Sequence, residues 1–200
     1  MRICRLAHKN WFPRARVSST LTIGRDSLDL PRMIRERTHI FTMPAPGPDL
    51  FLQSDAFIID VFKVMNEVAR HEFQLGTRHI ERVAHIAGKV PWGSNIWLGF
   101  VVDGAEVGDN IERLRDIPAQ VRFAHVKGAN AIPVFDVGGL NFVIVENAVE
   151  PVGYDELEAS CANAGARVFL GPRVEEAELR VPTATSTALV VAPTVQARRK

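Results

Sequence analysis

The stretch His71–Asp103, HEFQLGTRHIERVAHIAGKVPWGSNIWLGFVVD, decides the fold. Two apolar runs, Phe73–Leu75 and Ile96–Val102, flank the segment His79–Ile86, whose apolar residues recur at helical spacing. Two strands joined by one helix run parallel, because the helical crossover returns the chain to the same end of the sheet. The stretch therefore predicts one β-α-β unit.

The same alternation continues on both sides of this unit. Upstream, Ser54 is placed to cap a helix whose apolar residues, from Phe57 to Val68, form one stripe. Further helices are expected at 108–117 and 154–164, and further strands at 39–42, 121–126, 140–145 and 168–170. The pattern predicts an α/β fold in which alternating β-α units form a parallel sheet of five to six strands. Such a sheet is either open and doubly wound or part of a barrel.

Composition indicates one domain. The chain has 200 residues, 46% of them apolar, and a formal net charge of +1. We expect the α/β domain at residues 26–172, a basic N-terminal arm at 1–25 and a C-terminal tail at 173–200. The near-neutral charge does not indicate nucleic-acid binding, apart from the short basic termini.

No apolar run approaches the roughly 20 residues that cross a bilayer. We therefore expect a soluble, cytoplasmic protein that does not bind membranes. Organelle targeting by the basic N-terminus is the alternative.

Metal-binding residues are sparse. Cys4 and Cys161, the only two cysteines, are too few to hold an iron–sulfur cluster and fit a reducing compartment. The six histidines are scattered and form no HxxxH pair. His125 lies in a predicted strand and His39 begins another, so these two meet only if both face the same end of a barrel. We expect no metal site and no cofactor.

A family resemblance is carried by the segments DSLDLPRMIRERTHIFT, DLF (Asp49–Phe51), FIIDVFKVMNEVARHEFQLGTRHIERV, NIWLGFVVD, ERLRDIPAQVRFAHV, GLNFVIV and ELEASCANAGARVFL, in this order. In these segments the chain resembles a radical-SAM-related phage protein family of unknown function. The similarity covers about residues 26–171, and its most specific pieces are Asn95–Gly99 and Pro118–Phe123. The resemblance implies a partial (β/α) barrel.

The chain departs from that family where the family's chemistry lies. Family members begin with a CxxxCxxC triplet that holds a [4Fe–4S] cluster, and this triplet is absent here. The family's Glu-Pro-Leu at one strand end is replaced by Lys127–Ala129, and its Gly-Gly-Glu-Ser-Gly turn by Glu146–Glu150. The resemblance therefore implies a degenerate member, a non-catalytic scaffold or protein-interaction module. A fragment whose cysteine segment lies upstream of Met1 is a further alternative.

Four residues are candidates for ligand binding at the carboxyl ends of strands: Thr77, Arg78, Asp103 and Arg122. Thr77 and Arg78 occupy a strand-to-helix turn, where a hydroxyl and a guanidinium can bind a phosphate or carboxylate. Their alternative roles are a helix cap and a surface arginine. Asp103 is either a base or ribose binder or a turn residue, and Arg122 is either a ligand contact or an internally paired side chain.

These four residues support the alternative function, an enzyme or binding protein for a small anionic or nucleotide ligand that uses no iron–sulfur cluster. Catalytic residues stay unassigned, and the missing cluster ligands favour a protein that is not an enzyme.

A partial barrel that lacks its first β-α unit exposes a strand edge near residues 38–42. We expect a homodimer contact, a protein partner or the folded N-terminal arm to cover that edge.

Overall fold

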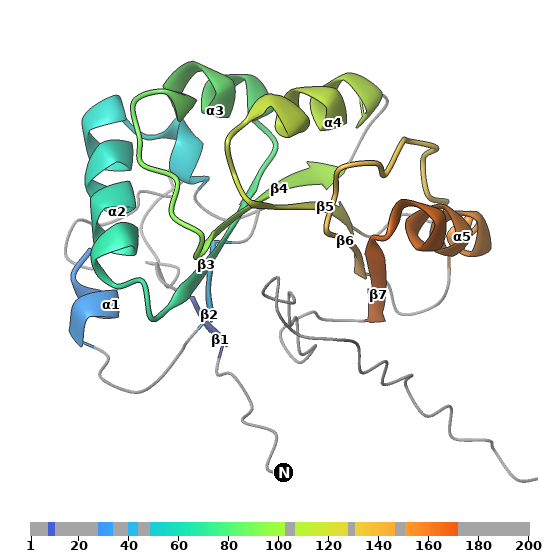
Figure 1. Ribbon diagram of the computed structural model, residues 1–200, viewed down its shortest axis with the longest axis horizontal. Helices are drawn as coiled ribbons and strands as arrows, with labels where there is room; N and C mark the ends of the chain where they lie inside the picture. The colour runs from blue at the N-terminus through green and yellow to red at the C-terminus, as the bar shows by residue number, and fades with distance from the viewer. Residues whose placement is uncertain are drawn as a thin grey trace, which may run out of the picture.

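The computed structural model describes residues 8–10, 28–33, 40–43, 49–102, 107–127, 131–146 and 151–171. These residues form one sheet of seven strands, and every neighbouring pair is parallel (Figure 1). The strands are β1 (His8–Asn10), β2 (Ile40–Met43), β3 (Glu72–Thr77), β4 (Ile96–Val102), β5 (Val121–Lys127), β6 (Phe142–Glu146) and β7 (Arg167–Gly171). The helices are α1 (Leu30–Met33), the 3-10 helix η2 (Leu50–Leu52), α2 (Asp55–Glu67), α3 (Ile80–Ala87), α4 (Val107–Asp116) and α5 (Tyr154–Ala164).

The strands stand in their sequential order, from β1 to β7. Figure 1 shows α2, α3, α4 and α5 along one side of the sheet. A doubly wound sheet reverses its strand order at a switch point, whereas sequential order with helices on one side is how a (β/α) barrel is built. The predicted α/β fold with a parallel sheet is confirmed. The sheet is open, with β1 and β7 at its edges, and the predicted count of five to six strands is too low.

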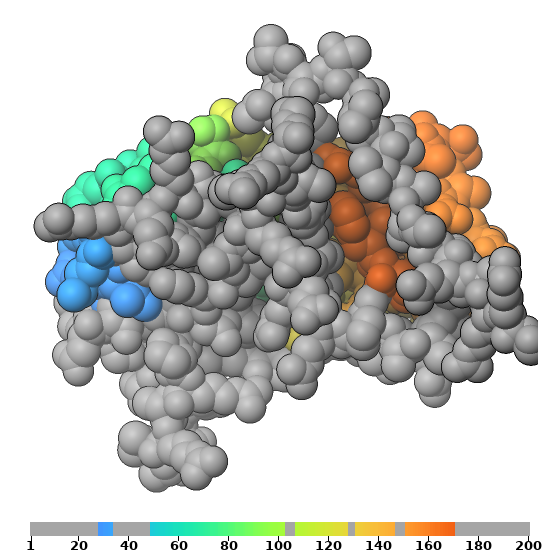
Figure 2. Space-filling view, turned by 90° about the horizontal axis from the view of Figure 1, so that it is seen from below, coloured from blue at the N-terminus to red at the C-terminus, as the bar shows by residue number. Residues whose placement is uncertain are grey.

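The extra strand comes from the N-terminal arm. Residues His8–Asn10 pair with β2 in parallel, so that the arm covers the edge that was expected to be exposed. The edge at the other end of the sheet is β7, which Figure 2 shows at the surface beside α5. The rest of the predicted arm up to residue 25 and the tail at 173–200 lie outside the described residues.

The helix-covered face of the sheet holds the larger part of the core. Phe73, Leu98 and Val143 on the strands belong to the same buried cluster as the apolar stripe of α2, and all seven residues of β4 are buried. Burying one such side chain stabilises the fold by about 1.5–3 kcal/mol. The stripe of α2 consists of Phe57, Ile58, Val61, Phe62, Val64 and Met65.

The opposite face, which we call the inner face, carries a separate aromatic cluster. Phe123 and Phe142 stack with ring centroids 5.0 Å apart, and Phe142 meets Trp97 and Phe169 edge to face at 6.0 Å. The Phe123 ring lies over Gly99, where an added Cβ would come within 2.1 Å of it. Gly99 is therefore needed for the ring to rest on β4.

Two helix ends follow the sequence signals. The Ser54 hydroxyl accepts a hydrogen bond from the Phe57 N–H at the start of α2, and Gly165 ends α5 in the left-handed conformation (φ +72°).

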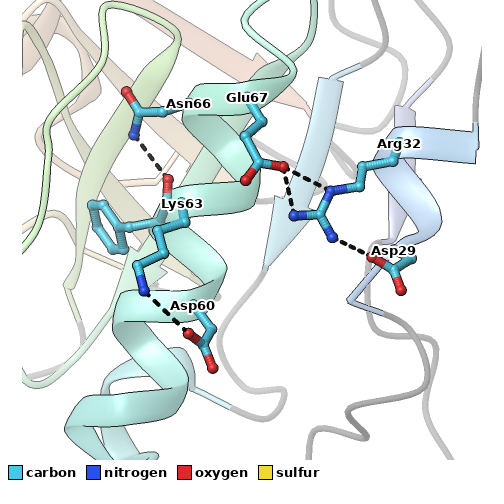
Figure 3. A network of polar contacts seen from close by, with 7 residues as sticks. Asp29, Arg32, Asp60, Lys63, Asn66 and Glu67 are labelled. Carbon is cyan, nitrogen blue, oxygen red and sulfur yellow. Dashed lines mark hydrogen bonds and ion pairs between the residues drawn. The ribbon is translucent and has the colours of Figure 1, made fainter.

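Short α1 is fixed to α2 by Arg32, whose Nε donates to Glu67 Oε2 at 2.8 Å (Figure 3). None of the helices in the described part of the chain is long and apolar enough to cross a membrane.

Candidate functional site

A charged cluster lies at the carboxyl ends of β5 and β6. Glu146 Oε2 is 2.9 Å from His125 Nε2 and 3.4 Å from Lys127 Nζ. Strand alternation explains the cluster, because Ala124 and Val126 belong to the helix-side core and the residues beside them face the inner side. The strand register then places Lys127 directly beside Glu146. Three side chains that are distant in sequence thus meet at one end of the sheet.

The three side chains are largely withdrawn from water. The exposed fractions of their side chains are 12% for His125, 20% for Lys127 and 32% for Glu146. Contact with His125 and the charge of Lys127 hold the pKa of Glu146 at about 2. Glu146 is therefore a carboxylate at neutral pH.

The charged groups of this cluster all act on the pKa of His125. Burial lowers its pKa, Lys127 and Arg78 lower it further, and Glu146 opposes them. Its Nε2 has no aligned hydrogen-bond partner in the described part of the chain, although Glu146 lies close. The imidazole is therefore neutral at neutral pH, with its Nε2 facing the Glu146 carboxylate.

Arg78 adds a second positive charge to this end of the sheet. It follows β3 directly, and it is close enough to His125 for its charge to lower the imidazole pKa. Its backbone N–H is 3.4 Å from Asp49 Oδ2. Of the three predicted ligand-binding residues that the structure describes, Thr77, Arg78 and Arg122, Arg78 is the one that it brings to the charged cluster.

Thr77 has a structural role instead. Its side chain is fully buried, and its hydroxyl donates to Asp49 Oδ2 at 2.7 Å and accepts from the His79 N–H at 2.9 Å. Asp49 also accepts from the Phe51 N–H at 2.9 Å. The geometry does not support ligand contact by Thr77, because its hydroxyl is occupied in fixing the turn that leads into α3.

Arg122 lies away from the cluster. It is the second residue of β5 and shares its register position with Leu98, on the helix-covered face. Its guanidinium donates to Ile117 O at 2.7 Å and to Leu114 O at 3.2 Å, at the end of α4. The prediction of ligand contact by Arg122 is therefore not supported, since internal pairing occupies the side chain. Asp103 lies outside the described residues.

The described residues do not fit an iron–sulfur cluster. Within them, no group of three His, Cys, Asp or Glu side chains is placed to hold a metal ion. Cys161 is buried on α5, and burial raises its pKa to about 11, which disfavours the thiolate that ligates iron. We therefore derive no chemistry through such a cluster.

Sequence reasoning noticed Lys127 and Glu146 but interpreted them as lost chemistry. Read as replacements of the family's residues, they predict a loss of function at the strand ends, whereas the structure joins them with His125. The alternation in Val121–Lys127 signals the shared face of His125 and Lys127. The contact with Glu146 depends on the register between β5 and β6, and this register cannot be read from a single sequence.

Comparison with known proteins identifies a family. Residues 2–151 match the model of a family described as "Protein of unknown function (DUF5131)". No match was found among curated proteins or among solved structures. These comparisons contain nothing that links the chain to radical SAM enzymes or to phages.

Proposed function

We propose that this chain, which belongs to the DUF5131 family of unknown function, binds a small anionic ligand at the carboxyl ends of β5 and β6. The observation that carries the proposal is the contact of Glu146 with both His125 and Lys127. Arg78 lies near enough for its charge to act on His125, so this end of the sheet carries two cationic side chains, Arg78 and Lys127, that can attract an anion.

Each side chain has a distinct role in this proposal. The Lys127 ammonium and the Arg78 guanidinium attract a phosphate or carboxylate, and charge-assisted hydrogen bonds are about twice as strong as neutral ones. Glu146 orients Lys127 and His125 rather than meeting the anion, because two carboxylates or a carboxylate and a phosphate repel. His125 lies against Glu146, so its pKa reports on the charges at the site. The carboxyl ends of parallel strands are also where α/β folds usually bind their ligands.

Calorimetric titration with inorganic phosphate and with ribose 5-phosphate tests the proposal. We expect saturable binding of at least one of them, and a loss of about tenfold or more in Lys127→Gln, since a hydrogen bond to a charged group contributes about 1.5–3 kcal/mol. Lys63→Gln is the matched control, because Lys63 lies on the exposed side of α2 and pairs with Asp60 at 3.6 Å (Figure 3). Equal affinities in both variants and the parent protein contradict the proposal.

The scaffold function predicted from sequence is the second candidate. Descent from radical-SAM-related phage proteins, and with it a non-catalytic role, stays a prediction, as does a homodimer or protein partner at a sheet edge. Anaerobic reconstitution with iron and sulfide, followed by titration with SAM and with inorganic phosphate, tests both candidates, and phosphate binding separates them. A scaffold takes up no cluster and binds neither SAM nor phosphate, whereas the anion site binds phosphate without iron.

A further inference from the structure

One buried polar side chain on the inner face is not explained by the fold. Gln74, in the middle of β3, is only 6% exposed, and its Nε2 has no hydrogen-bond partner in the described part of the chain. Buried amide groups are nearly always hydrogen-bonded, because an unpaired one loses its contacts with water and gains nothing in return. The Gln74 amide therefore points to a partner that is not part of the described chain.

Gln74 shares its face of the sheet with the aromatic cluster and with the anion site. The register places it beside Trp97, which belongs to the inner-face cluster. Arg78 follows four residues later, about 13 Å away at about 3.3 Å per residue. Gln74, in the middle of β3, and Arg78, just after its carboxyl end, thus lie on the same face of the sheet.

Between these two points β3 carries no side chain on the inner face. The intervening residue is Gly76, which remains partly exposed to solvent although Leu75 and Thr77 beside it are buried. Its neighbour on β4 is Gly99, over which the Phe123 ring lies. A planar group laid over Gly76 would meet the Phe123 ring at its side, and such aromatic contacts are favourable.

We propose that the ligand of the anion site extends along β3 and that Gln74 donates a hydrogen bond to a carbonyl oxygen on its planar ring. The ligand class is thus a phosphorylated or carboxylated heterocycle with a ring carbonyl. Arg78 and Lys127 hold its anionic group, and Gln74 selects the ring. This inference rests on the proposed function and adds the specificity of the same site.

Calorimetric titration of the full chain with uridine 5′-monophosphate and ribose 5-phosphate tests the inference, because the two differ by the carbonyl-bearing ring. We expect the parent protein to bind the nucleotide at least about tenfold more tightly, which corresponds to about 1.4 kcal/mol. Gln74→Met, which keeps the length and removes the donor, lowers nucleotide affinity toward that of ribose 5-phosphate and leaves ribose 5-phosphate binding unchanged. Gln74→Glu lowers it too, since a carboxylate repels the carbonyl oxygen. Gln120→Met, on an exposed loop residue, is the matched control and changes neither affinity.

The melting temperature of Gln74→Met is a second readout. An amide that serves a ligand has no partner in the free protein, so methionine leaves the melting temperature equal or higher. A clear fall in melting temperature means that Gln74 has a structural partner, and this overturns the inference. Equal affinity of the parent protein for the nucleotide and ribose 5-phosphate overturns it as well, while the proposed anion site stands. If neither compound nor inorganic phosphate binds, the proposed function fails and the inference fails with it.

Discussion

The two faces of the same sheet differ in what they are made of. On the helix-covered face, Phe73, Leu98 and Val143 are buried and apolar along with their neighbours. On the inner face, aromatic rings occupy the amino-terminal half, and His125, Lys127 and Glu146 occupy the carboxyl ends. Side chains that stabilise the fold and side chains available for a ligand are thus separated by the alternation of β5 and β6. Substitutions on the helix-covered face should therefore change mainly the free energy of unfolding, and substitutions at the carboxyl ends of the inner face should change mainly the affinity for a ligand.

The largest effect is expected on the helix-covered face. Phe62→Ala removes a fully buried ring that packs edge to face against Trp92, with centroids 5.0 Å apart. We expect a loss of about 3–5 kcal/mol in the free energy of unfolding, measured by urea denaturation. Leu52→Ala, at a residue that is 63% exposed, is the control and should change it by less than about 0.5 kcal/mol. A loss below about 1 kcal/mol in Phe62→Ala would show that this face does not carry the core.

A smaller loss is expected at the end of β3. Thr77→Val keeps the shape and removes the hydroxyl that links Asp49 to the start of α3. Because the lost hydrogen bond is to a carboxylate, we expect a loss of about 1.5–3 kcal/mol in the free energy of unfolding.

Thr77→Ser restores most of that stability if the hydroxyl has a structural role. Phosphate affinity in Thr77→Val should stay within about twofold of the parent, a difference of about 0.4 kcal/mol. A folded Thr77→Val protein of full stability that no longer binds phosphate would instead restore Thr77 as a ligand contact.

The smallest effect concerns pH. The folded pKa of Glu146 is about 2, below the value of about 4.3 for an unpaired glutamate. Its contribution to stability is therefore fully present above pH 4.3 or so and is lost as pH falls toward about 2. Glu146→Gln should flatten the stability curve within this window and leave it unchanged in shape above it, as measured by urea denaturation at a series of pH values. An unaltered acid dependence in Glu146→Gln would mean that the carboxylate is not paired.

Local patterns predicted much of the fold. The stripe from Phe57 to Val68, the Ser54 cap and the Gly165 stop all depend on residues within a few positions of each other, and these predictions are confirmed. The strand His8–Asn10 was missed because three polar residues have no apolar alternation, and their place in the sheet comes from pairing with β2.

The candidate site was harder to predict, for a related reason. Thr77 and Arg78 are adjacent in sequence, yet the threonine is buried against Asp49 while the arginine lies near His125. Neighbours along a strand face opposite sides of the sheet. Residue type and position at a strand end are therefore not enough to predict which side chain can contact a ligand. The partner of Lys127 is Glu146, which only the β5–β6 register brings into contact.

The His125 imidazole provides the most direct measurement of the central claim, because it lies within the proposed anion site. Its pKa, followed by NMR titration with and without inorganic phosphate, should rise when phosphate binds, since a nearby anion favours the protonated ring. Lys127→Gln should raise this pKa in the absence of phosphate and Glu146→Gln should lower it, because the two charges act on His125 in opposite directions. A His125 pKa that phosphate leaves unchanged, while both variants shift it as described, would show a charged cluster that does not bind anions and would contradict the account.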